Sequence, residues 1–275
     1  MKNEFEIHPL QTREELLACV ALQKETWGKG FTESVPPSLL LASQKVGGVA
    51  AGAFTPEKEL VGFVFGISGI ENGKLVHWSD MLAVKRHLRN RGLGWRLKIY
   101  QRSVLLAKDV HTIYWSYDPL EARNAHLNFN KLGVTFSSYV KEMYPGEESI
   151  LHRGLGTDRF VVAWKIQSKH VEKIVAGETP NLPPEVDKAP VVTLRRTDGA
   201  ADSEAAELPA DKIVRVEVPA NIQREKQQGD LGRRWRACTR RAFLHYSSAG
   251  YQIGHYYKDD GSGRCFYVLT SLLPC

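Results

Sequence analysis

The feature that most constrains the fold of this chain is a change of period at the phrase Gly92-Leu93-Gly94. Before this phrase, apolar residues predict three consecutive strands over residues 49–54, 60–67 and 75–84, separated by short turn phrases. After it, apolar residues recur at helical spacing from Leu93 to Ala107. The sequence therefore predicts an antiparallel meander whose last strand leads through a glycine turn into a helix.

The segments on either side extend this pattern over residues 5–166. Thr12 and Glu15 form a capping box that predicts a first helix, and Pro36-Pro37 predicts the start of a second helix. Further strands are expected at residues 5–7, 110–117, 134–143 and 160–166, and a further helix at residues 122–132. The predicted order is β-α-α-β-β-β-α-β-α-β-β, which is a mixed α/β (α+β) arrangement.

The remainder of the chain predicts a separate extension. Residues 177–190 carry four prolines, so a linker is expected between a domain of residues 1–176 and an extension of residues 191–275. The extension is expected to be of β-α-β-β type and to pack on the main sheet or extend it. Its predicted segments are strands at 191–194, 213–218, 251–257 and 265–270, a helix from about Asp230, and an exposed loop at 198–212.

The amino-acid composition limits the classes of protein to which this chain can belong. The 275 residues have 43% hydrophobic and 25% charged content, which is typical of a soluble globular protein, and the net charge of +6 is compatible with an anionic partner. The four cysteines form no C-x-x-C pair, so neither a zinc site nor a disulfide framework is expected. Without a signal-like or membrane-spanning segment, a reduced, cytoplasmic protein is the simpler interpretation.

The basic stretch from Lys85 to Lys98 has three interpretations. The first is a surface that binds nucleic acid, the second is a loop that binds one phosphorylated ligand (a phosphate cradle), and the third is the solvated side of a helix. A glycine turn at a helix start favours the cradle, because unpaired N–H groups and the helix dipole both attract an anion there. Gly92 and Gly94 also let the backbone approach that anion closely.

Three phrases together resemble the GNAT superfamily of acyl-CoA N-acyltransferases. Arg89-Asn90-Arg91-Gly92-Leu93-Gly94 is similar to its R-x-x-G-x-G pyrophosphate loop, and Leu82-Ala83-Val84 is similar to the end of its fourth strand. Residues 124–134 resemble its fourth helix. The resemblance covers roughly residues 5–166 and implies a GNAT-like mixed, mostly antiparallel sheet flanked by helices. Residues 216–223, 235–243 and 250–253 resemble the extension of a branch of predicted acetyltransferases.

The resemblance implies a binding site for acyl-CoA. Backbone contacts with the pantetheine arm are implied for Met81, Leu82, Ala83 and Val84. Pyrophosphate contacts are implied for Arg89, Arg91, Gly92, Leu93, Gly94 and Trp95, whereas Arg96 and Lys98 are expected to face solvent. Asn124 and Asn128, one turn apart, are expected on the same side of their helix, as pantetheine ligands or as caps and surface residues.

The same resemblance suggests catalytic residues. Asp80 coincides with a position where relatives often place a base, so it is a general base or, equally, binds the substrate ammonium without moving a proton. Strand alternation places Asp80 with Trp78 and Leu82, and His77 with Ser79 and Met81 on the other face. Phe129 stands where the family has a tyrosine acid. Tyr139 and Tyr117 are candidate replacements, although strand aromatics are more often core residues.

The implied activity is N-acylation of a small amine or amino acid by direct attack in a ternary complex. Acetyl-CoA is the default co-substrate and no metal is required. Alternatives are a succinyl-CoA donor, whose carboxylate Arg123 or Arg153 would receive, and a non-catalytic acyl-CoA sensor or scaffold, suggested by Phe129. Acceptor choice is expected from residues 27–37 and 144–159. Nucleic acid is not a favoured partner, because the arginines near residues 233–241 are expected to be solvated, and the extension is compatible with a homodimer.

Overall fold

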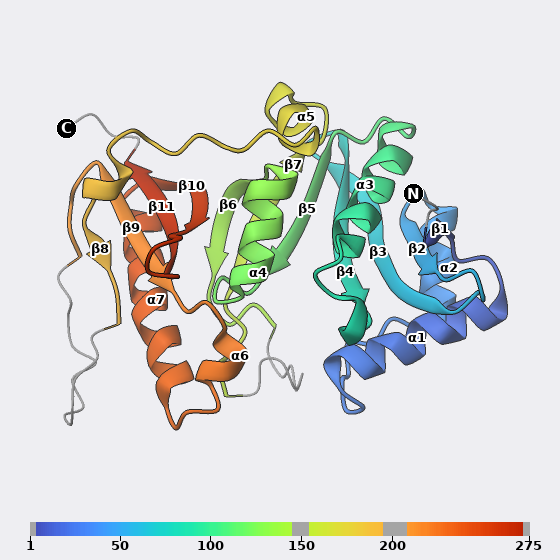
Figure 1. Ribbon diagram of the computed structural model, residues 1–275. Helices are drawn as coiled ribbons and strands as arrows, with labels where there is room; N and C mark the ends of the chain where they lie inside the picture. Colours follow the sequence, from blue (N-terminus) through green and yellow to red (C-terminus); the bar gives the residue numbers. More distant parts are fainter. Residues whose placement is uncertain (1–3, 145–153, 195–207, 272–275) are drawn as a thin grey trace. The chain divides into compact units, whose positions relative to one another are not determined.

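The structure is a computed structural model that describes residues 4–144, 154–194 and 208–271 (Figure 1). Contacts between residues divide the chain into two compact units. The first contains the described residues 4–115 and 164–168, and the second contains 116–144, 154–163, 169–194 and 208–271. This division follows contacts and not the linker at residues 177–190, so the domain boundary drawn there stays a prediction.

The first unit is a sheet covered by helices on both faces. Its strands pair in the order β1-β2-β3-β4-β5, antiparallel except for the parallel pair β4 and β5. The elements in chain order are β1 (Glu6–Pro9), α1 (Arg13–Trp27), α2 (Pro37–Lys45), β2 (Val49–Phe54), β3 (Leu60–Glu71), β4 (Lys74–Val84), the 3-10 turn η1 (Arg86–Leu88), α3 (Leu93–Leu106) and β5 (Thr112–Tyr117).

Local sequence signals account for these boundaries. The capping box at Thr12 is present, with the Thr12 side chain accepting from the Glu15 N–H and the Glu15 carboxylate accepting from the Thr12 N–H. Asn72 and Gly73 both have positive φ, 50° and 74°, as the tight turn between β3 and β4 requires. On one face of the sheet, Leu16 and Leu22 of α1 pack with Phe63 and other buried residues of β3 and β4.

The second unit contains two groups of strands. β6 (Thr135–Val140) pairs antiparallel with β7 (Arg159–Lys165), and a four-stranded sheet has the order β10-β11-β9-β8. The other elements are α4 (Ala122–Ala125), the π-helix η2 (His126–Leu132), α5 (Lys169–Val175), η3 (Val186–Lys188), β8 (Val191–Val192), β9 (Ile213–Val218), α6 (Ile222–Glu225), α7 (Leu231–Ser248), β10 (Tyr251–Lys258) and β11 (Cys265–Ser271). An aromatic cluster of Phe160, Phe243 and Tyr267, with ring centroids 4.6–5.6 Å apart, is part of its core.

The predicted fold class and order of elements are confirmed. Corrections concern the second unit. The helix expected at 122–132 is one α-helical turn followed by a π-helix, and residues 169–175 form a helix that the sequence analysis did not predict. The extension contains a second parallel strand pair, β8 with β9, and a short helix α6 in addition to the predicted β-α-β-β elements. Most of the loop expected at 198–212 lies outside the described residues.

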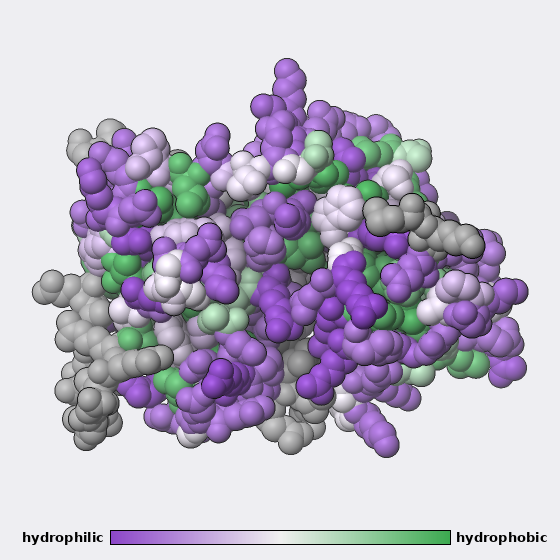
Figure 2. Space-filling view, viewed as in Figure 1, coloured by the Kyte–Doolittle hydropathy of each residue, from purple (hydrophilic) through white to green (hydrophobic). Residues whose placement is uncertain are grey.

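Several negative findings apply to the described part of the chain. No helix there is long and apolar enough to cross a membrane, and no group of three or more His, Cys, Asp or Glu side chains is arranged to hold a metal ion. Cys19, Cys238 and Cys265 are free thiols. The face seen in Figure 2 is covered largely by hydrophilic residues, with hydrophobic ones scattered between them.

Candidate acyl-donor site

The loop between β4 and α3 exposes the start of a helix. Asn90 and Gly92 have positive φ, 67° and 77°, and Gly92 in the left-handed region is the N-cap of α3. The first backbone bond of the helix runs from the Arg96 N–H to the Gly92 carbonyl, 3.0 Å. The N–H groups of Leu93 and Gly94 precede that bond, so they belong to the turn in which helix N–H groups lack intrahelical acceptors. This turn can bind an anion.

The two arginines of the phrase lie in the same loop. Arg89 is exposed, and its Nε donates to the Val84 carbonyl at the end of β4, 3.0 Å. Arg91 is also exposed and lies 3.8 Å from the Glu4 carboxylate, a weak surface pair that an anionic ligand can replace. The loop therefore combines helix N–H groups with two accessible guanidinium groups.

Asp80 is the extra residue of a β-bulge. Phe65 pairs with Met81 and Gly66 pairs with Ser79, so Asp80 has no partner in β3. The bulge reverses the alternation of side chains along β4. Ser79, before the bulge, bonds to α3, whereas Met81, after it, packs in the core with α1 and α2. The predicted grouping of His77, Ser79 and Met81 on one face is therefore wrong at Met81, because a strict period of two does not survive an inserted residue.

Leu82 is displaced in the same way. Its Cδ2 atom lies 3.9 Å from the position that a Cβ on Gly94 would occupy, so Leu82 lies on the α3 side of the sheet and not with Asp80. The prediction that His77 and Asp80 lie on opposite faces is consistent with their neighbours, since His77 bonds to Gln101 of α3 and Asp80 is influenced by Glu33, which precedes α2.

The Asp80 carboxylate has the environment of an accessible but poorly solvated acid. Its side chain is exposed to solvent, yet surrounding protein raises its pKa above the ordinary value, chiefly through desolvation. A hydrogen bond with Trp78 acts in the opposite direction, and the negative charge of Glu33 adds to the increase. A raised pKa brings a carboxylate closer to the pH at which it serves as a general base.

Lys98 is buried, whereas the sequence analysis expected it to face solvent. It is 3% exposed, its Nζ donates to Ser79 Oγ and Gln101 Oε1, both at 2.9 Å, and it lies 3.7 Å from the centroid of the Trp115 ring. Burial lowers its pKa well below the ordinary lysine value. Arg96 also differs from the prediction, because its Nη2 donates to the Phe5 carbonyl, 2.8 Å.

The Lys98 contacts belong to a chain of polar groups that are buried, except for the half-buried Ser68 at its end. Ser79 Oγ donates to Gln101 Oε1 at 3.0 Å, Gln101 Nε2 lies 3.0 Å from His77 Nε2, and Ser68 Oγ lies 3.0 Å from His77 Nδ1. Burial, with the charges of Lys98 and Lys108, lowers the pKa of His77 to about 3. We call Ser68, His77, Ser79, Lys98 and Gln101 the buried polar chain. Its only sequence signal is that Lys98 and Gln101, one turn apart, adjoin the apolar positions of α3.

Tyr139 lies in the second unit and its hydroxyl is already engaged. The hydroxyl donates to Asp158, whose carboxylate also accepts from Arg240 Nε and Nη2, both at 2.7 Å. Burial and this carboxylate raise the pKa of Tyr139 well above the ordinary tyrosine value. Such a phenol is a weak proton donor, and the catalytic role of Tyr139 stays a prediction.

Asn124 and Asn128 differ in their exposure to solvent. Asn124 is exposed, whereas Asn128 is 4% exposed and its side chain hydrogen-bonds the buried hydroxyl of Tyr117. Their expected place on one side of the helix, as pantetheine ligands, stays a prediction. Phe129 is buried and packs edge-on against Tyr267, with ring centroids 5.9 Å apart.

Two of the arginines of α7 form ion pairs with carboxylates, whereas the sequence analysis expected them to be solvated. Arg236 is 4% exposed and its Nη2 donates to Asp118 at 2.6 Å, while its Nε donates to the Leu155 carbonyl. Arg240 binds Asp158 and Glu142. These pairs remove two of the cations on which a nucleic-acid surface would depend. Of the acceptor loop expected at 144–159, residues 145–153 lie outside the described part of the chain.

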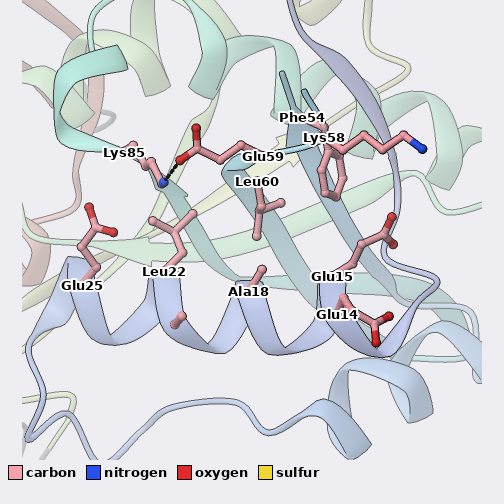
Figure 3. A pocket seen from close by; sticks show the side chains of 11 residues that line it. Glu14, Glu15, Ala18, Leu22, Glu25, Phe54, Lys58, Glu59, Leu60 and Lys85 are labelled. Atoms are coloured by element: carbon pink, nitrogen blue, oxygen red, sulfur yellow. Dashed lines mark hydrogen bonds and ion pairs between the residues drawn. The ribbon is translucent and has the colours of Figure 1, made fainter. Parts of the chain in front are cut away.

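A cavity of about 350 Å³ lies between α1 and the turn from β2 to β3 (Figure 3). Its floor includes Leu22 and Leu60, and Lys85 at its edge bonds to Glu59. Its acidic lining residues are Glu14, Glu15, Glu25 and Glu59. None of the predicted site residues lines this cavity, so it is separate from the predicted acyl-donor site.

Comparison with known proteins gives matches only among solved structures. No family model and no curated protein matches the sequence. The ribosomal-protein-S18-alanine N-acetyltransferase from Escherichia coli shares 16% identity, covering 60% of this chain and 95% of that chain, at a TM-score of 0.46. Arabidopsis thaliana Naa50, in complex with the bisubstrate analogue CoA-Ac-MVNAL, shares 15% identity, covering 58% of this chain and 97% of that chain, at a TM-score of 0.47. An acetyltransferase of the GNAT family from Streptococcus pneumoniae shares 16% identity, covering 58% of this chain and 98% of that chain, at a TM-score of 0.46.

The order of the elements in the chain agrees with the order predicted from the sequence. The described residues have the predicted order of elements, a bulge in the fourth strand, and the glycine loop at the start of the following helix. The described residues therefore form the mixed, mostly antiparallel sheet with flanking helices that the sequence predicted.

Proposed function

We propose that this protein is an acyl-CoA-dependent N-acyltransferase that acts on a small amine or amino acid, with acetyl-CoA as donor. The observation that carries the proposal is the start of α3, where the helix N–H groups after Gly92, which is in the left-handed region, directly follow the exposed Arg89 and Arg91 in the chain. Pyrophosphate fits this arrangement because helix amides and guanidinium groups supply charge-assisted hydrogen bonds without a metal ion.

The neighbouring part of β4 suits the remainder of the donor. Residues 81–84 pair with β3 along one edge, whereas the pairs between β4 and β5 involve residues 76–78 of β4. The other edge of residues 81–84 is therefore a candidate for backbone hydrogen bonds with the pantetheine amides. N–H groups of this segment near Met81 would stabilise the oxyanion, and Asp80 would accept a proton from the attacking ammonium, directly or through water.

The second candidate is a module that binds acyl-CoA without turnover. Phe129 favours it, since a phenyl ring cannot protonate a leaving thiolate, and this ring is buried against Tyr267. A coenzyme A thiol has a pKa near that of cysteine, about 8.5, and leaves without full protonation more easily than an alkoxide, so the enzyme remains the first proposal.

Gly94→Ala tests the donor site, because the fold itself does not require glycine there. An added Cβ would meet only Leu82 Cδ2 at 3.9 Å, an ordinary contact, and alanine favours helix formation by about 0.5–1 kcal/mol. We expect wild-type protein to bind coenzyme A in calorimetry and Gly94→Ala to bind it at least about tenfold more weakly, with no loss of stability. Gly69→Ala, in an exposed strand with nothing within 4 Å, is the matched control.

The results separate the candidates. No coenzyme A binding by the wild type at millimolar concentration would exclude both the enzyme and the module. Equal affinity of wild type and Gly94→Ala would exclude this loop as the phosphate site. Coenzyme A binding without thiol release from acetyl-CoA across a panel of amines would favour the module.

Asp80→Asn tests the proposed base. We expect the rate to fall about 100-fold or more, and the acid limb of the pH profile of kcat/KM, set by the raised pKa of Asp80, to disappear. Glu33→Gln is the matched control. It removes the negative charge that helps raise this pKa, so it should move the acid limb to lower pH and leave the maximum rate largely unchanged. An unchanged limb and rate in Asp80→Asn would remove Asp80 from the mechanism.

A further inference from the structure

β4 and β5 separate directly after a short parallel ladder. Residues 76–78 of β4 pair with residues 112–114 of β5, and β4 then continues to Val84. Ser79 and Trp115 are therefore the first residues of the two strands beyond the last pair. We call the point defined by these two residues the fork.

Lys98 reaches from α3 to both sides of the fork. Its Nζ donates to Ser79 Oγ at 2.9 Å and lies 3.7 Å from the centroid of the Trp115 ring. A further hydrogen bond, to Gln101 Oε1 at 2.9 Å, engages the amino group within its own helix. The side chain is buried, and no carboxylate among the described residues forms an ion pair with it. One side chain thus joins the two strands at the point where they part.

The rest of the buried polar chain holds Lys98 in this position. Ser79 and Gln101 bond to each other, and Gln101 in turn contacts His77. His77 occupies space that exists because residue 66 is glycine, since a Cβ there would lie 2.3 Å from His77 Nε2. The partners of Lys98 are therefore held in place by both the strand and the helix, so the Lys98 side chain has a defined position at the fork.

We propose that Lys98 is the specificity-determining residue for the acyl group and closes the fork so that only a short, uncharged acyl group fits. The inference rests on the proposed function. With pyrophosphate at the start of α3, next to the end of β4, a pantetheine arm along β4 runs from Val84 toward Ser79 and its acyl end faces the fork. The amino group is already engaged by Ser79, Gln101 and the Trp115 ring, so no N–H remains to receive an acyl carboxylate.

Lys98→Ala is the direct test. Removing the side chain beyond Cβ opens the fork, and it leaves no orphaned partner, because Ser79 and Gln101 still bond to each other. The measurements are kcat/KM with acetyl-, butyryl- and succinyl-CoA, and the affinity for each by calorimetry. Lys108→Ala is the matched control, since Lys108 donates to the Gly47 carbonyl and does not contact Ser79 or Trp115.

We expect the wild type to prefer acetyl-CoA over butyryl-CoA and over succinyl-CoA. In Lys98→Ala, the ratio of butyryl to acetyl kcat/KM should rise at least about tenfold, the usual effect of one or two methylene groups in a pocket, while Lys108→Ala keeps the wild-type ratio. An unchanged ratio in a folded Lys98→Ala that binds coenzyme A would overturn the inference and leave the proposed function standing. A wild type that prefers butyryl-CoA or succinyl-CoA would overturn it without any variant, whereas absence of coenzyme A binding would remove the proposed function itself.

Discussion

The two units bury charge in opposite ways. In the second unit, Arg236 faces Asp118 at 2.6 Å, with both side chains at most 5% exposed, so the buried cation has a buried anion. In the first unit, Lys98 is equally buried but contacts neutral oxygens and an aromatic ring. A paired arginine cross-links elements and tolerates no loss of its partner. Burying a lysine that has no counter-charge costs folding free energy, because the amino group loses its hydration. We therefore assign Lys98 to function.

The difference predicts a large loss of stability for Asp118→Asn. This change removes the anion and leaves a buried guanidinium whose Nη1 has no hydrogen-bond partner among the described residues. We expect the free energy of unfolding to fall by about 3–5 kcal/mol, measured by urea denaturation. Glu59→Gln, which breaks the exposed pair with Lys85, should cost no more than about 1 kcal/mol. A loss below 1 kcal/mol for Asp118→Asn would mean that the two units do not differ in this respect.

The buried polar chain predicts a pH dependence of intermediate size. The pKa of His77 is lowered to about 3 in the folded state from an ordinary 6.5, so between these values the unfolded chain binds a proton that the folded chain does not. Stability must therefore fall as the pH falls below 6.5, by about 1.4 kcal/mol per pH unit, or about 2 kcal/mol between pH 6.5 and 5. Unfolding measured at both pH values should show this difference.

His77→Gln isolates this contribution from other groups. Burial also lowers the pKa of His126 and His255, so the wild-type slope contains their contributions, and the decrease in slope on substitution belongs to His77. The carboxylate of Asp158, whose pKa is below its usual value, acts only at still lower pH. An identical slope in wild type and His77→Gln would show that His77 is already protonated in the fold.

The same comparison shows what a sequence can reveal. Turn residues and periodicity predicted the meander, the capping box and the glycine loop because each depends on neighbours in the chain. The bulge at Asp80 was not predictable, since it arises from pairing with β3, and it changed the face of Met81 and Leu82. Lys98, Arg236 and Arg240 were expected in solvent because charged side chains usually are. Apart from Gln101, which lies one turn from Lys98 in α3, their partners come from distant segments that the sequence does not place.

Lys98→Met gives the smallest expected effect on stability and the sharpest contrast with Asp118→Asn. Methionine keeps most of the length of the side chain and its contact with the Trp115 ring, but it has no charge to desolvate. Replacing a buried charged group by an apolar one of similar volume is often neutral or stabilising, so we expect a change within about 1 kcal/mol in urea denaturation. A loss of 3 kcal/mol or more would indicate that Lys98 has a counter-charge, as Arg236 has. In that case the lysine would be structural, and the acyl specificity proposed for it would lose its physical basis.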